Sequence, residues 1–287
     1  MTEVRSPTVR RRELGAMLRA LRIEKGLTVD QVAERLLCSP SKVSRMETGQ
    51  RGVTSRDVRD LCELYGITEQ AERDRLMTIA HEGRQQAWWQ SFDLNYSRYV
   101  GLEAAALSIR GYQSSVIPAL LQTADYARAL LEGSPLRPKP DVIEQRVEAR
   151  LIRQHLLEQE PAPRFWEVLD EAALHRLVGG PVVLRRQLDR LIEACQLPAV
   201  TIQVIPFAAG AHPGLESNFK ILELSPPAPP VVCVEGLNRE SYLERPEDLE
   251  DYERVFNQLK AVALTPADSI DFIARIRNSL RLRQHVT

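Results

Sequence analysis

Hydrophobic residues recur with helical spacing near the start of the chain. Leu14, Met17, Leu18 and Leu21 stand at i, i+3, i+4 and i+7, which places them on one side of a helix. Gly26 follows this run, and glycine is the residue that most often ends a helix. The pattern therefore predicts a first helix that starts near residue 11 and ends before Gly26.

Two further helices are predicted by the signals at their N-termini. Residues 28–31, with the sequence Thr-Val-Asp-Gln, have the form of a capping box and open a helix that extends to about residue 36. Ser39 followed by Pro40 is an N-cap with proline at the first helical position, and it opens a helix over about residues 40–47. A short turn separates these two helices.

The chain continues with two more predicted helices. A fourth begins at the sequence Thr-Ser-Arg-Asp of residues 54–57 and ends at Gly66, with Val58 and Leu61 on its inner side. Apolar residues recur over 69–89 and predict one more helix. The first part of the chain is therefore expected to be an all-α domain of five helices.

The second and third helices have the composition of a helix-turn-helix unit. Ala33 is small where the two helices cross, and Val43 is apolar where the third helix packs on the core. A helix that reads base edges in the major groove needs hydrogen-bonding side chains on its outer face. The outer positions of the third helix hold Ser41, Lys42, Ser44 and Arg45.

Several short motifs follow one another in a familiar order over residues 11–67. They are Leu18-Arg19-x-Leu21-Arg22, Gly26-Leu27-Thr28, Val32-Ala33-Glu34 and Ser41-Lys42-Val43-Ser44-Arg45-Met46-Glu47-Thr48-Gly49. In this order they closely resemble the phage-repressor and Cro type (XRE-type) of helix-turn-helix domain. One position departs from that family, because the turn before the third helix often holds glycine and here holds Leu37. Leu37 either adopts a left-handed backbone, at about 1–2 kcal/mol, or the turn has another shape.

The resemblance implies DNA contacts for exposed residues of this unit. Ser41 and Arg45, with their neighbours on the third helix, face base edges or flanking phosphates, and Arg45 paired with guanine is the expected base contact. Thr28 and Gln31 are expected to position a phosphate at the N-terminus of the second helix. The full set of expected DNA-binding residues is Thr28, Gln31, Ser39, Ser41, Lys42, Ser44, Arg45, Gln50 and Arg51.

The resemblance also implies a structural ion pair. Arg22 on the first helix and Glu47 on the third are expected to bind each other and are therefore not counted as DNA contacts. An alternative for the whole segment is a helical bundle that binds other proteins and never meets DNA.

Beyond residue 100, helical and β-branched segments alternate. Strands are predicted over residues 109–115, 165–169, 200–206, 219–224 and 231–235, and helices over 102–107, 124–131, 141–159, 171–178, 181–195, 247–263 and 266–283. The expected fold is multi-domain, with an all-α five-helix repressor-like helix-turn-helix domain followed by a mixed α/β (α+β) domain. The expected divisions are a flexible basic tail (1–10), the DNA-binding domain (11–80), a connector (81–100) and a regulatory, dimerisation and partner-binding domain (101–287).

Motifs of the second domain carry another resemblance, over roughly residues 88–275. They include Val116-Ile117-Pro118-Ala119-Leu120-Leu121-Gln122-Thr123-Ala124-Asp125-Tyr126-Ala127-Arg128, Arg150-Leu151-Ile152-Arg153-Gln154, Leu169-Asp170-Glu171-Ala172 and Val204-Ile205-Pro206-Phe207. They are similar to the C-terminal domain, of uncharacterised function, in actinobacterial antitoxin-like transcriptional regulators. The resemblance implies regulation and a gene for a very small partner protein nearby. It supplies no established catalytic residue.

The charge balance adds to this interpretation because it is uneven along the chain. The net charge is −1, but residues 1–59 carry 13 Lys and Arg against 7 Asp and Glu, a surplus of +6, and the remainder carries −7. A basic segment of this kind is suited to a polyanion. No apolar run approaches the ~18 residues of a membrane span, and the Arg-rich first residues are expected to be neither signal peptide nor anchor. We therefore expect a cytoplasmic, nucleoid-associated protein that does not bind membranes.

Motifs for catalysis or metal binding are incomplete. Residues 81–85 begin like a zinc-protease motif, but Gln85 replaces the second histidine. His212 and Glu216 form only part of a metal set, and the cysteines Cys38, Cys62, Cys195 and Cys233 lie far apart, as expected of free thiols. No catalytic residue, metal or cofactor is therefore expected.

Other polar and aromatic residues leave two interpretations open. Asp170 and Glu171 are candidate acid and base carboxylates, but Asp170 also fits the N-cap of the next helix, which is preferred. Trp88 and Trp89 either stack on bases or pack within the protein, and packing is preferred. The small-residue loop 207–214 is either a ligand or partner mouth or an ordered surface connection.

The leading hypothesis is a sequence-specific transcriptional regulator that acts as a homodimer. Its recognition helix, about residues 40–47, would read double-stranded DNA with a pseudo-palindromic operator. The C-terminal domain would receive a signal, either a partner or an unknown small-molecule effector. One alternative is an antitoxin-like module that sequesters a small protein encoded by a neighbouring gene, with DNA binding for autoregulation. A remote alternative is a DNA-targeted enzyme.

Overall fold

A computed structural model describes residues 6–92, 94, 96–135, 138–236 and 240–282. The chain forms two compact units. The N-terminal unit contains residues 1–91, 97–105 and 224–229, and the C-terminal unit contains residues 92–96, 106–223 and 230–287. The division differs from the expected domain limits because residues 97–105 and 224–229 join the N-terminal unit.

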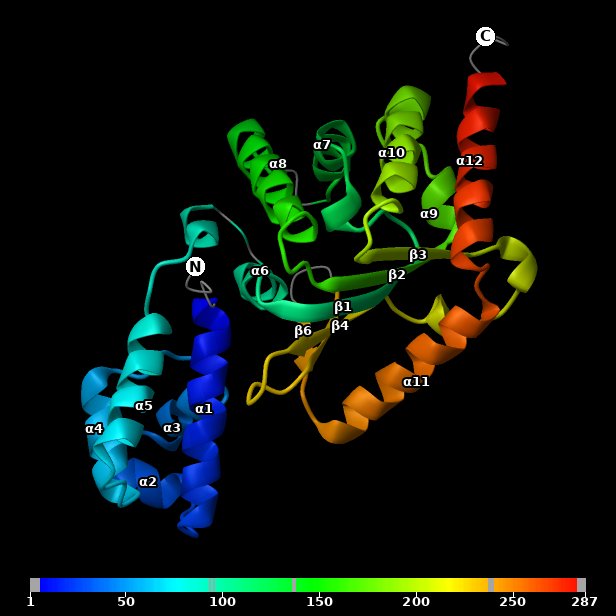
Figure 1. The fold of residues 1–287 in the computed structure, drawn as a ribbon. Coiled ribbons are helices and arrows are strands. Elements are labelled where there is room, and N and C mark those ends of the chain that lie inside the picture. Colours follow the sequence, from blue (N-terminus) through cyan, green and yellow to red (C-terminus); the bar gives the residue numbers. More distant parts are fainter. Residues whose placement is uncertain (1–5, 93, 95, 136–137, 237–239, 283–287) are drawn as a thin grey trace. The chain divides into compact units, whose positions relative to one another are not determined.

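The N-terminal unit is helical, as predicted. Its elements are α1 (Pro7–Glu24), α2 (Val29–Arg35), α3 (Pro40–Glu47), α4 (Ser55–Leu64), α5 (Gln70–Glu82), the 3₁₀ turn η1 (Trp88–Ser91) and α6 (Ser97–Glu103) (Figure 1). Leu14 and Leu18 of α1 are buried against Val43 and Met46 of α3 and Leu61 of α4. The predicted apolar stripe of the first helix thus forms the centre of this core.

The first helix begins earlier than predicted. It starts at Pro7, the first helical residue, and Ser6, Thr8 and Val9 are buried. Ser6 Oγ donates a hydrogen bond of 2.5 Å to the carbonyl of Gly101 in α6. The prediction of a flexible tail over residues 1–10 is therefore wrong for residues 7–10, because a partner about ninety residues later in the chain orders them. Residues 1–5 lie outside the described part of the chain.

The fifth helix ends earlier than predicted. Its last residue is Glu82, whereas the apolar pattern extends to Trp89. Gly83 follows at the point where the chain passes α1, and a Cβ there would lie 3.0 Å from Arg11 Cγ. Trp89 lies in η1 and is buried, in agreement with the packing role preferred for it.

A six-stranded sheet forms the centre of the C-terminal unit. Its strands are β1 (Ala106–Gln113), β2 (Arg164–Asp170), β3 (Val200–Ile205), β4 (Phe219–Leu224), β5 (Val231–Val234) and β6 (Ser241–Leu243), in the order β3-β2-β1-β4-β5-β6. β2 pairs with β1 and with β3 in parallel, and β5 pairs with β4 and with β6 in antiparallel. The sheet is therefore mixed, which confirms the expected α+β class.

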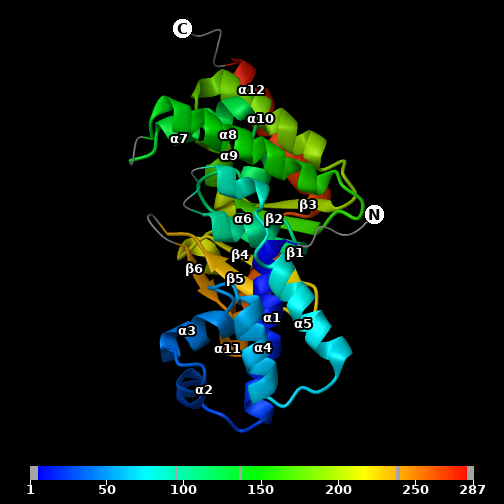
Figure 2. The same ribbon diagram turned by 90° about the vertical axis from the view of Figure 1, so that its left-hand side faces the viewer.

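Helices cover both faces of this sheet. They are α7 (Ala124–Glu132), α8 (Pro140–Gln154), α9 (Glu171–His175), α10 (Gly180–Ala194), α11 (Pro246–Val262) and α12 (Pro266–Leu282). Figure 1 and Figure 2 show α11 on one face and α7, α8, α10 and α12 on the other. On the α11 face, Phe256 and Leu259 pack against Tyr112, Val168 and Ile205. The strand β6 was not predicted, since its residues are only partly buried and carry little apolar signal.

A buried ion pair spans the centre of the sheet. Lys220 on β4 and Glu167 on β2 are not on neighbouring strands, because β1 lies between them. Lys220 Nζ nevertheless lies 2.5 Å from both carboxylate oxygens of Glu167. Gly111 of β1 gives the room for this, since a Cβ there would be 2.5 Å from Lys220 Cδ. Burial raises the pKa of Glu167 to about 7, although the charge of Lys220 acts in the opposite direction.

Candidate nucleic-acid interface

The helix α2 starts at a complete capping box. Thr28 Oγ1 accepts a hydrogen bond from the amide of Gln31, and the side chain of Gln31 accepts one from the amide of Thr28. Both residues are exposed. The reciprocal bonds fix the first turn of α2 and hold its N-terminus, where the helix dipole favours an anion, at the surface.

The turn from α2 to α3 contains the residue that departs from the family pattern. Leu37 has φ +50°, the left-handed conformation, and is 94 % exposed. The amide of Leu37 donates to Glu34 and that of Cys38 to Ala33, so the end of α2 is closed by backbone bonds. The sequence left open whether Leu37 adopts a left-handed backbone or the turn has another shape, and the structure has the left-handed backbone.

The helix α3 is amphipathic in the way a recognition helix requires. Ser39 caps it, with its side chain accepting a hydrogen bond from the amide of Lys42. Val43 and Met46 are fully buried, whereas Ser41, Ser44 and Arg45 are exposed. Arg45 Nε donates to the carbonyl of Ser41 at 3.2 Å, which uses one of its five donors. The other donors of Arg45 make no hydrogen bond to a described residue, so they are available to a DNA acceptor.

Glycines bring α3 close to α1. A Cβ on Gly15 would lie 2.5 Å from the carbonyl oxygen of Glu47, and one on Gly49 would lie 2.8 Å from the backbone of Arg12. Gly49 also has φ +67°, which a larger residue rarely adopts. These contacts fix where the last turn of α3 sits on α1.

An ion pair holds the same two helices together. Arg22 Nε lies 2.6 Å from Glu47 Oε1, and Arg22 Nη2 lies 2.9 Å from Glu47 Oε2. The pair is bidentate and mostly buried, and Arg22 also donates to the carbonyl of Leu27. The hydrogen bond with Glu47 raises the pKa of Arg22 against the opposing effect of burial. Arg22 and Glu47 therefore have the structural role that the family resemblance implied.

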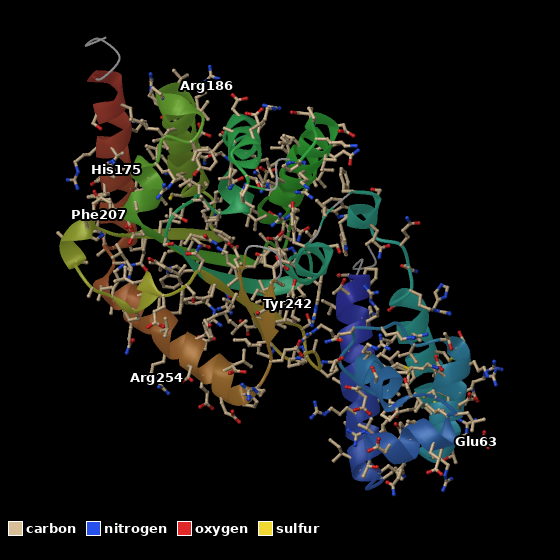
Figure 3. All side chains as sticks on the ribbon, turned by 180° about the vertical axis from the view of Figure 1, so that it is seen from behind. Glu63, His175, Arg186, Phe207, Tyr242 and Arg254 are labelled. Atoms are coloured by element: carbon tan, nitrogen blue, oxygen red, sulfur yellow. The ribbon has the colours of Figure 1, made fainter. Side chains whose placement is uncertain are left out.

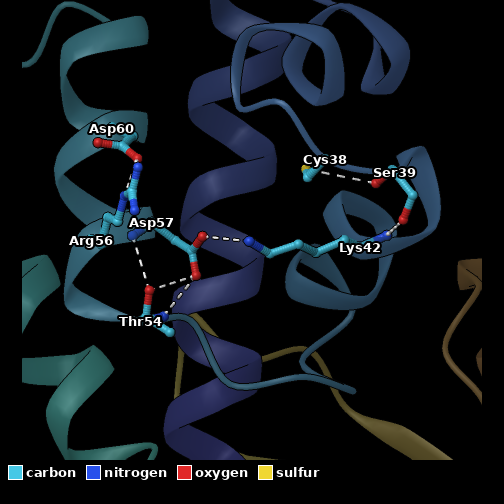
Figure 4. A network of polar contacts seen from close by, with 7 residues as sticks. All are labelled: Cys38, Ser39, Lys42, Thr54, Arg56, Asp57 and Asp60. Atoms are coloured by element: carbon cyan, nitrogen blue, oxygen red, sulfur yellow. Dashed lines mark hydrogen bonds and ion pairs between the residues drawn. The ribbon is translucent and has the colours of Figure 1, made fainter.

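Lys42 lies in a polar network and not at the exposed face. Its Nζ is 2.6 Å from Asp57 Oδ1, with the two side chains 24 % and 12 % exposed (Figure 4). Asp57 also accepts hydrogen bonds from Thr54, whose hydroxyl caps α4. Burial raises the pKa of Asp57, but the hydrogen bonds from Lys42 and Thr54 outweigh it and the net pKa is lowered. The prediction that Lys42 faces bases or phosphates does not agree with this geometry, because its charge binds Asp57.

Gln50 and Arg51 follow α3 and are both exposed. The amide of Arg51 donates to the carbonyl of Arg45 at 3.0 Å, which closes the end of the helix. The structure therefore leaves eight residues of the predicted set exposed, at the N-caps of α2 and α3, within these helices or directly after α3: Thr28, Gln31, Ser39, Ser41, Ser44, Arg45, Gln50 and Arg51. Lys42 is the residue of the predicted set that is partly buried.

Candidate acid and base residues of the C-terminal unit make structural contacts. Asp170 caps α9 by accepting from the amide of Ala172 at 2.8 Å, as preferred from the sequence. Its second oxygen lies 3.3 Å from His212 Nε2, while His212 Nδ1 accepts from the amide of Gly214. Glu171 accepts from the amide of Phe207 and contacts His175. Both ring nitrogens of His212 are thus engaged within the protein.

The sulfur and metal chemistry of the described residues is simple. Cys38, Cys62, Cys195 and Cys233 are free thiols, and burial raises the pKa of Cys195 to about 11. Within the part of the chain that the structure describes, no three His, Cys, Asp or Glu side chains gather as metal ligands. Among these residues, none of the helices is both long and apolar enough to cross a bilayer.

Comparison with known proteins identifies both parts of the chain. Residues 13–76 match the family described as Helix-turn-helix domain, and residues 96–275 match the family described as Domain of unknown function (DUF5753). The second match covers more than half of the chain. No curated protein and no solved structure matches significantly. The expected order, a helix-turn-helix domain followed by a domain of uncharacterised function, is confirmed.

Proposed function

The chain belongs to the family defined by the domain of unknown function DUF5753, and from this premise we propose that it is a sequence-specific transcriptional regulator. Its helix-turn-helix domain binds DNA, and the C-terminal domain receives the signal that controls binding. The observation that best supports this proposal is the amphipathic character of α3. This helix buries Val43 and Met46 and exposes Ser41, Ser44 and Arg45. A helix with this division can enter the major groove with donors toward the bases.

The proposed regulator acts as a homodimer on a pseudo-palindromic operator. A single short α3 reaches only a few base pairs, so two copies related by a twofold axis are needed for a site of useful specificity. The two half-sites would lie about 34–36 Å apart, one turn of DNA. Light scattering of the purified chain with and without operator tests this: a complex whose mass equals that of the duplex plus one 32.5 kDa chain would contradict it.

Selection of genomic fragments by the purified full-length chain tests the main proposal. We expect recovery of a common sequence motif. The variant Arg45→Ala should bind that motif about 1–3 kcal/mol more weakly and show relaxed preference at one or two bases. Arg19→Ala, which removes an exposed arginine from α1, is the control and should keep the preference. Specific binding that survives the combined change Ser41→Ala and Arg45→Ala would refute α3 as the recognition helix.

We propose no catalytic role for the C-terminal domain. This is supported by the engaged ring nitrogens of His212 and by the capping role of Asp170. Glu171→Gln and His212→Asn should therefore leave regulation of the target genes unchanged when the variants accumulate normally. Loss of regulation with normal DNA binding in both variants would revive the enzyme hypothesis.

An antitoxin-like module that sequesters a small protein is the second candidate function. Phe207 begins the small-residue loop 207–214 and Leu215 follows it, and these residues are 60 % and 65 % exposed. Phe207 stacks on His175 at 6.0 Å between ring centroids (Figure 3). Exposed apolar residues of this kind are suited to a protein partner. Native affinity purification should then yield a stoichiometric small protein that Phe207→Ser releases, whereas a clean homodimer would count against this function.

A further inference from the structure

Three helices of the N-terminal unit end in the same backbone motif. After α1, α2 and α4, one amide donates to the carbonyl three residues earlier, and the next amide donates to the carbonyl five residues earlier. This is the Schellman motif, in which the first of the two residues is left-handed and is usually glycine. That residue is Gly26 after α1 and Gly66 after α4, but it is Leu37 after α2.

Leu37 is the exception to how the described part of the chain builds its left-handed positions. The other six described residues with a positive φ are all glycines: Gly26, Gly49, Gly66, Gly179, Gly180 and Gly210. A Cβ on Gly26 would have no atom within 4 Å, so the chain keeps glycine there although a side chain has room. Open space alone therefore does not explain a leucine at the end of α2. A left-handed leucine is strained, and strain of this kind gathers at functional sites.

The side chain of Leu37 does not repay this strain by packing. Its neighbours Leu36 and Cys38 pack against the core of the N-terminal unit, and Leu37 does not belong to that core. Its exposed fraction of 94 % is the highest among the large apolar residues that the structure describes. A single exposed apolar residue is ordinary on a protein surface, but here exposure and backbone strain coincide in one residue.

Leu37 lies at the end of α3 that enters the major groove in a helix-turn-helix protein. Only Cys38 separates it from Ser39, the N-cap of α3, and Figure 4 shows both of these residues. The N-terminal residues of a recognition helix contact base edges. Ser41 and Arg45 offer hydrogen-bonding groups on the same helix, and Leu37 adds an apolar group. The apolar feature of a base edge in the major groove is the C5-methyl group of thymine.

We propose that Leu37 contacts the C5-methyl group of a thymine in the operator half-site. The contact rests on the proposed function, because it requires α3 in the major groove. It makes Leu37 a second determinant of sequence preference beside Arg45. Arg45 selects a base through hydrogen bonds, whereas Leu37 selects thymine over cytosine, which has no methyl group at this position. The left-handed backbone keeps the side chain of Leu37 outside the core, where DNA can reach it.

The test removes the methyl group from the DNA and the side chain from the protein, separately and together. The motif selected by the full-length chain is synthesised with each thymine in turn replaced by deoxyuridine, which lacks only the C5-methyl group. Fluorescence anisotropy measures the affinities. Wild-type binding should weaken about fourfold at one thymine of the half-site, the effect of losing one buried methyl-sized group. Leu37→Ala should bind the unmodified motif at least as weakly and lose nothing further at that thymine.

Two variants control for the general effect of the substitution. Ile23→Ala removes another exposed apolar side chain, at the end of α1, and should keep the wild-type response to every deoxyuridine. Leu37→Gly removes the side chain together with the backbone strain. It should match Leu37→Ala in its responses, because the proposal assigns the contact to the side chain.

The proposal is overturned if Leu37→Ala and the wild type respond alike to every deoxyuridine, or if the motif contains no thymine. It is also overturned if Leu37→Ala keeps these responses and lowers the mass of the DNA-free chain in light scattering, because Leu37 would then contact a second copy. A chain that selects no motif fails the proposed function itself. A motif that depends on Arg45 but on no thymine methyl group fails this inference alone.

Discussion

Leu37 combines two unfavourable features in one residue. Its backbone is left-handed, with φ +50°, and its side chain is 94 % exposed and contributes little to the core. Leu37→Gly should relieve about 1–2 kcal/mol of backbone strain and lose about 0.5–1 kcal/mol to the greater freedom of the unfolded chain. The free energy of unfolding in urea should therefore rise by up to about 1.5 kcal/mol.

The matched control for this change is Leu37→Ala, which removes the same exposed side chain and retains the strain. It should leave the stability near that of the wild type. If Leu37→Gly were less stable than Leu37→Ala, the left-handed conformation of this turn would be wrong.

In the C-terminal unit, the single residue Gly111 makes room for the buried ion pair of Lys220 and Glu167. It has no Cβ, and this absence lets Lys220 cross β1 and reach Glu167. Gly111→Ala should displace Lys220 and leave two buried charges without partners, which costs about 3–5 kcal/mol. Urea unfolding of the variant measures the loss.

Gly133→Ala is the control for added volume at a glycine. Its φ is −76°, and its new Cβ would lie 3.4 Å from the nearest atom, which is an ordinary contact. The change should alter stability by less than about 0.5 kcal/mol. Equal losses in the two variants would show that Gly111 does not act through Lys220.

At the scale of elements, the contact between α3 and α4 depends on Lys42 and Asp57. Lys42→Ala removes the ion pair of 2.6 Å and leaves a mostly buried carboxylate with weaker compensation. The free energy of unfolding at neutral pH should fall by about 1–3 kcal/mol, while the base preference of the operator stays unchanged. The two substitutions should therefore have opposite effects. Arg45→Ala should change the base preference and leave the free energy of unfolding unaffected.

The pH dependence of this pair has a definite sign. The pKa of Asp57 is lowered in the folded chain, so its contribution is present above the usual value of 3.8 and is lost as the pH falls through the lowered pKa. The difference in stability between the wild type and Lys42→Ala should therefore shrink on acidification below about pH 4. A difference that grows in acid would contradict the ion pair.

Helix limits marked by local signals could be predicted, and those set by distant contacts could not. The capping residues Thr28, Ser39 and Thr54 lie three residues before their bonding partners, so the starts of α2, α3 and α4 follow from the sequence. The start of α1 depends on Ser6 and Gly101, which are far apart in the chain. No local pattern reveals such a bond.

The same limit applies to the candidate site. The outer residues of α3 follow from periodicity, because Val43 and Met46 define its inner side. The pairing of Lys42 with Asp57 depends on how α4 packs, which periodicity does not give.

Motif residues of the C-terminal unit also find a structural explanation. Gln154 donates to the carbonyls of Ala119 and Gln122, and Gln187 bonds the backbone of Leu121 and Thr123. These glutamines satisfy the backbone of an irregular segment that lies against α8 and α10. The sequence placed Gln154 in a motif but did not indicate that it holds a loop.

At the scale of the whole molecule, the positive charge is concentrated in the part of the chain that contains most of the helix-turn-helix match. The negative charge is concentrated in the part that contains the DUF5753 match. Residues 1–59, most of which fall in the helix-turn-helix match, carry +6, and the remainder carries −7. The net charge of −1 therefore does not describe the electrostatic potential at the helix-turn-helix domain. Binding should depend on the basic segment alone, since the acidic remainder repels a polyanion.

This division predicts a steep dependence of DNA affinity on salt. Each phosphate that a protomer neutralises releases counterions and adds about −0.9 to the slope of log K against log salt. If each protomer of a dimer engages roughly two to four phosphates, the slope lies between about −4 and −7. Anisotropy titrations of the full-length chain in potassium chloride measure this slope.

The control is a Glu→Gln change at exposed acidic positions of α11, such as Glu247 and Glu250. It should leave the slope unchanged, because it does not alter the contacts with phosphate. A slope near zero would mean that the +6 segment does not meet the DNA backbone, and α3 would lose its proposed role.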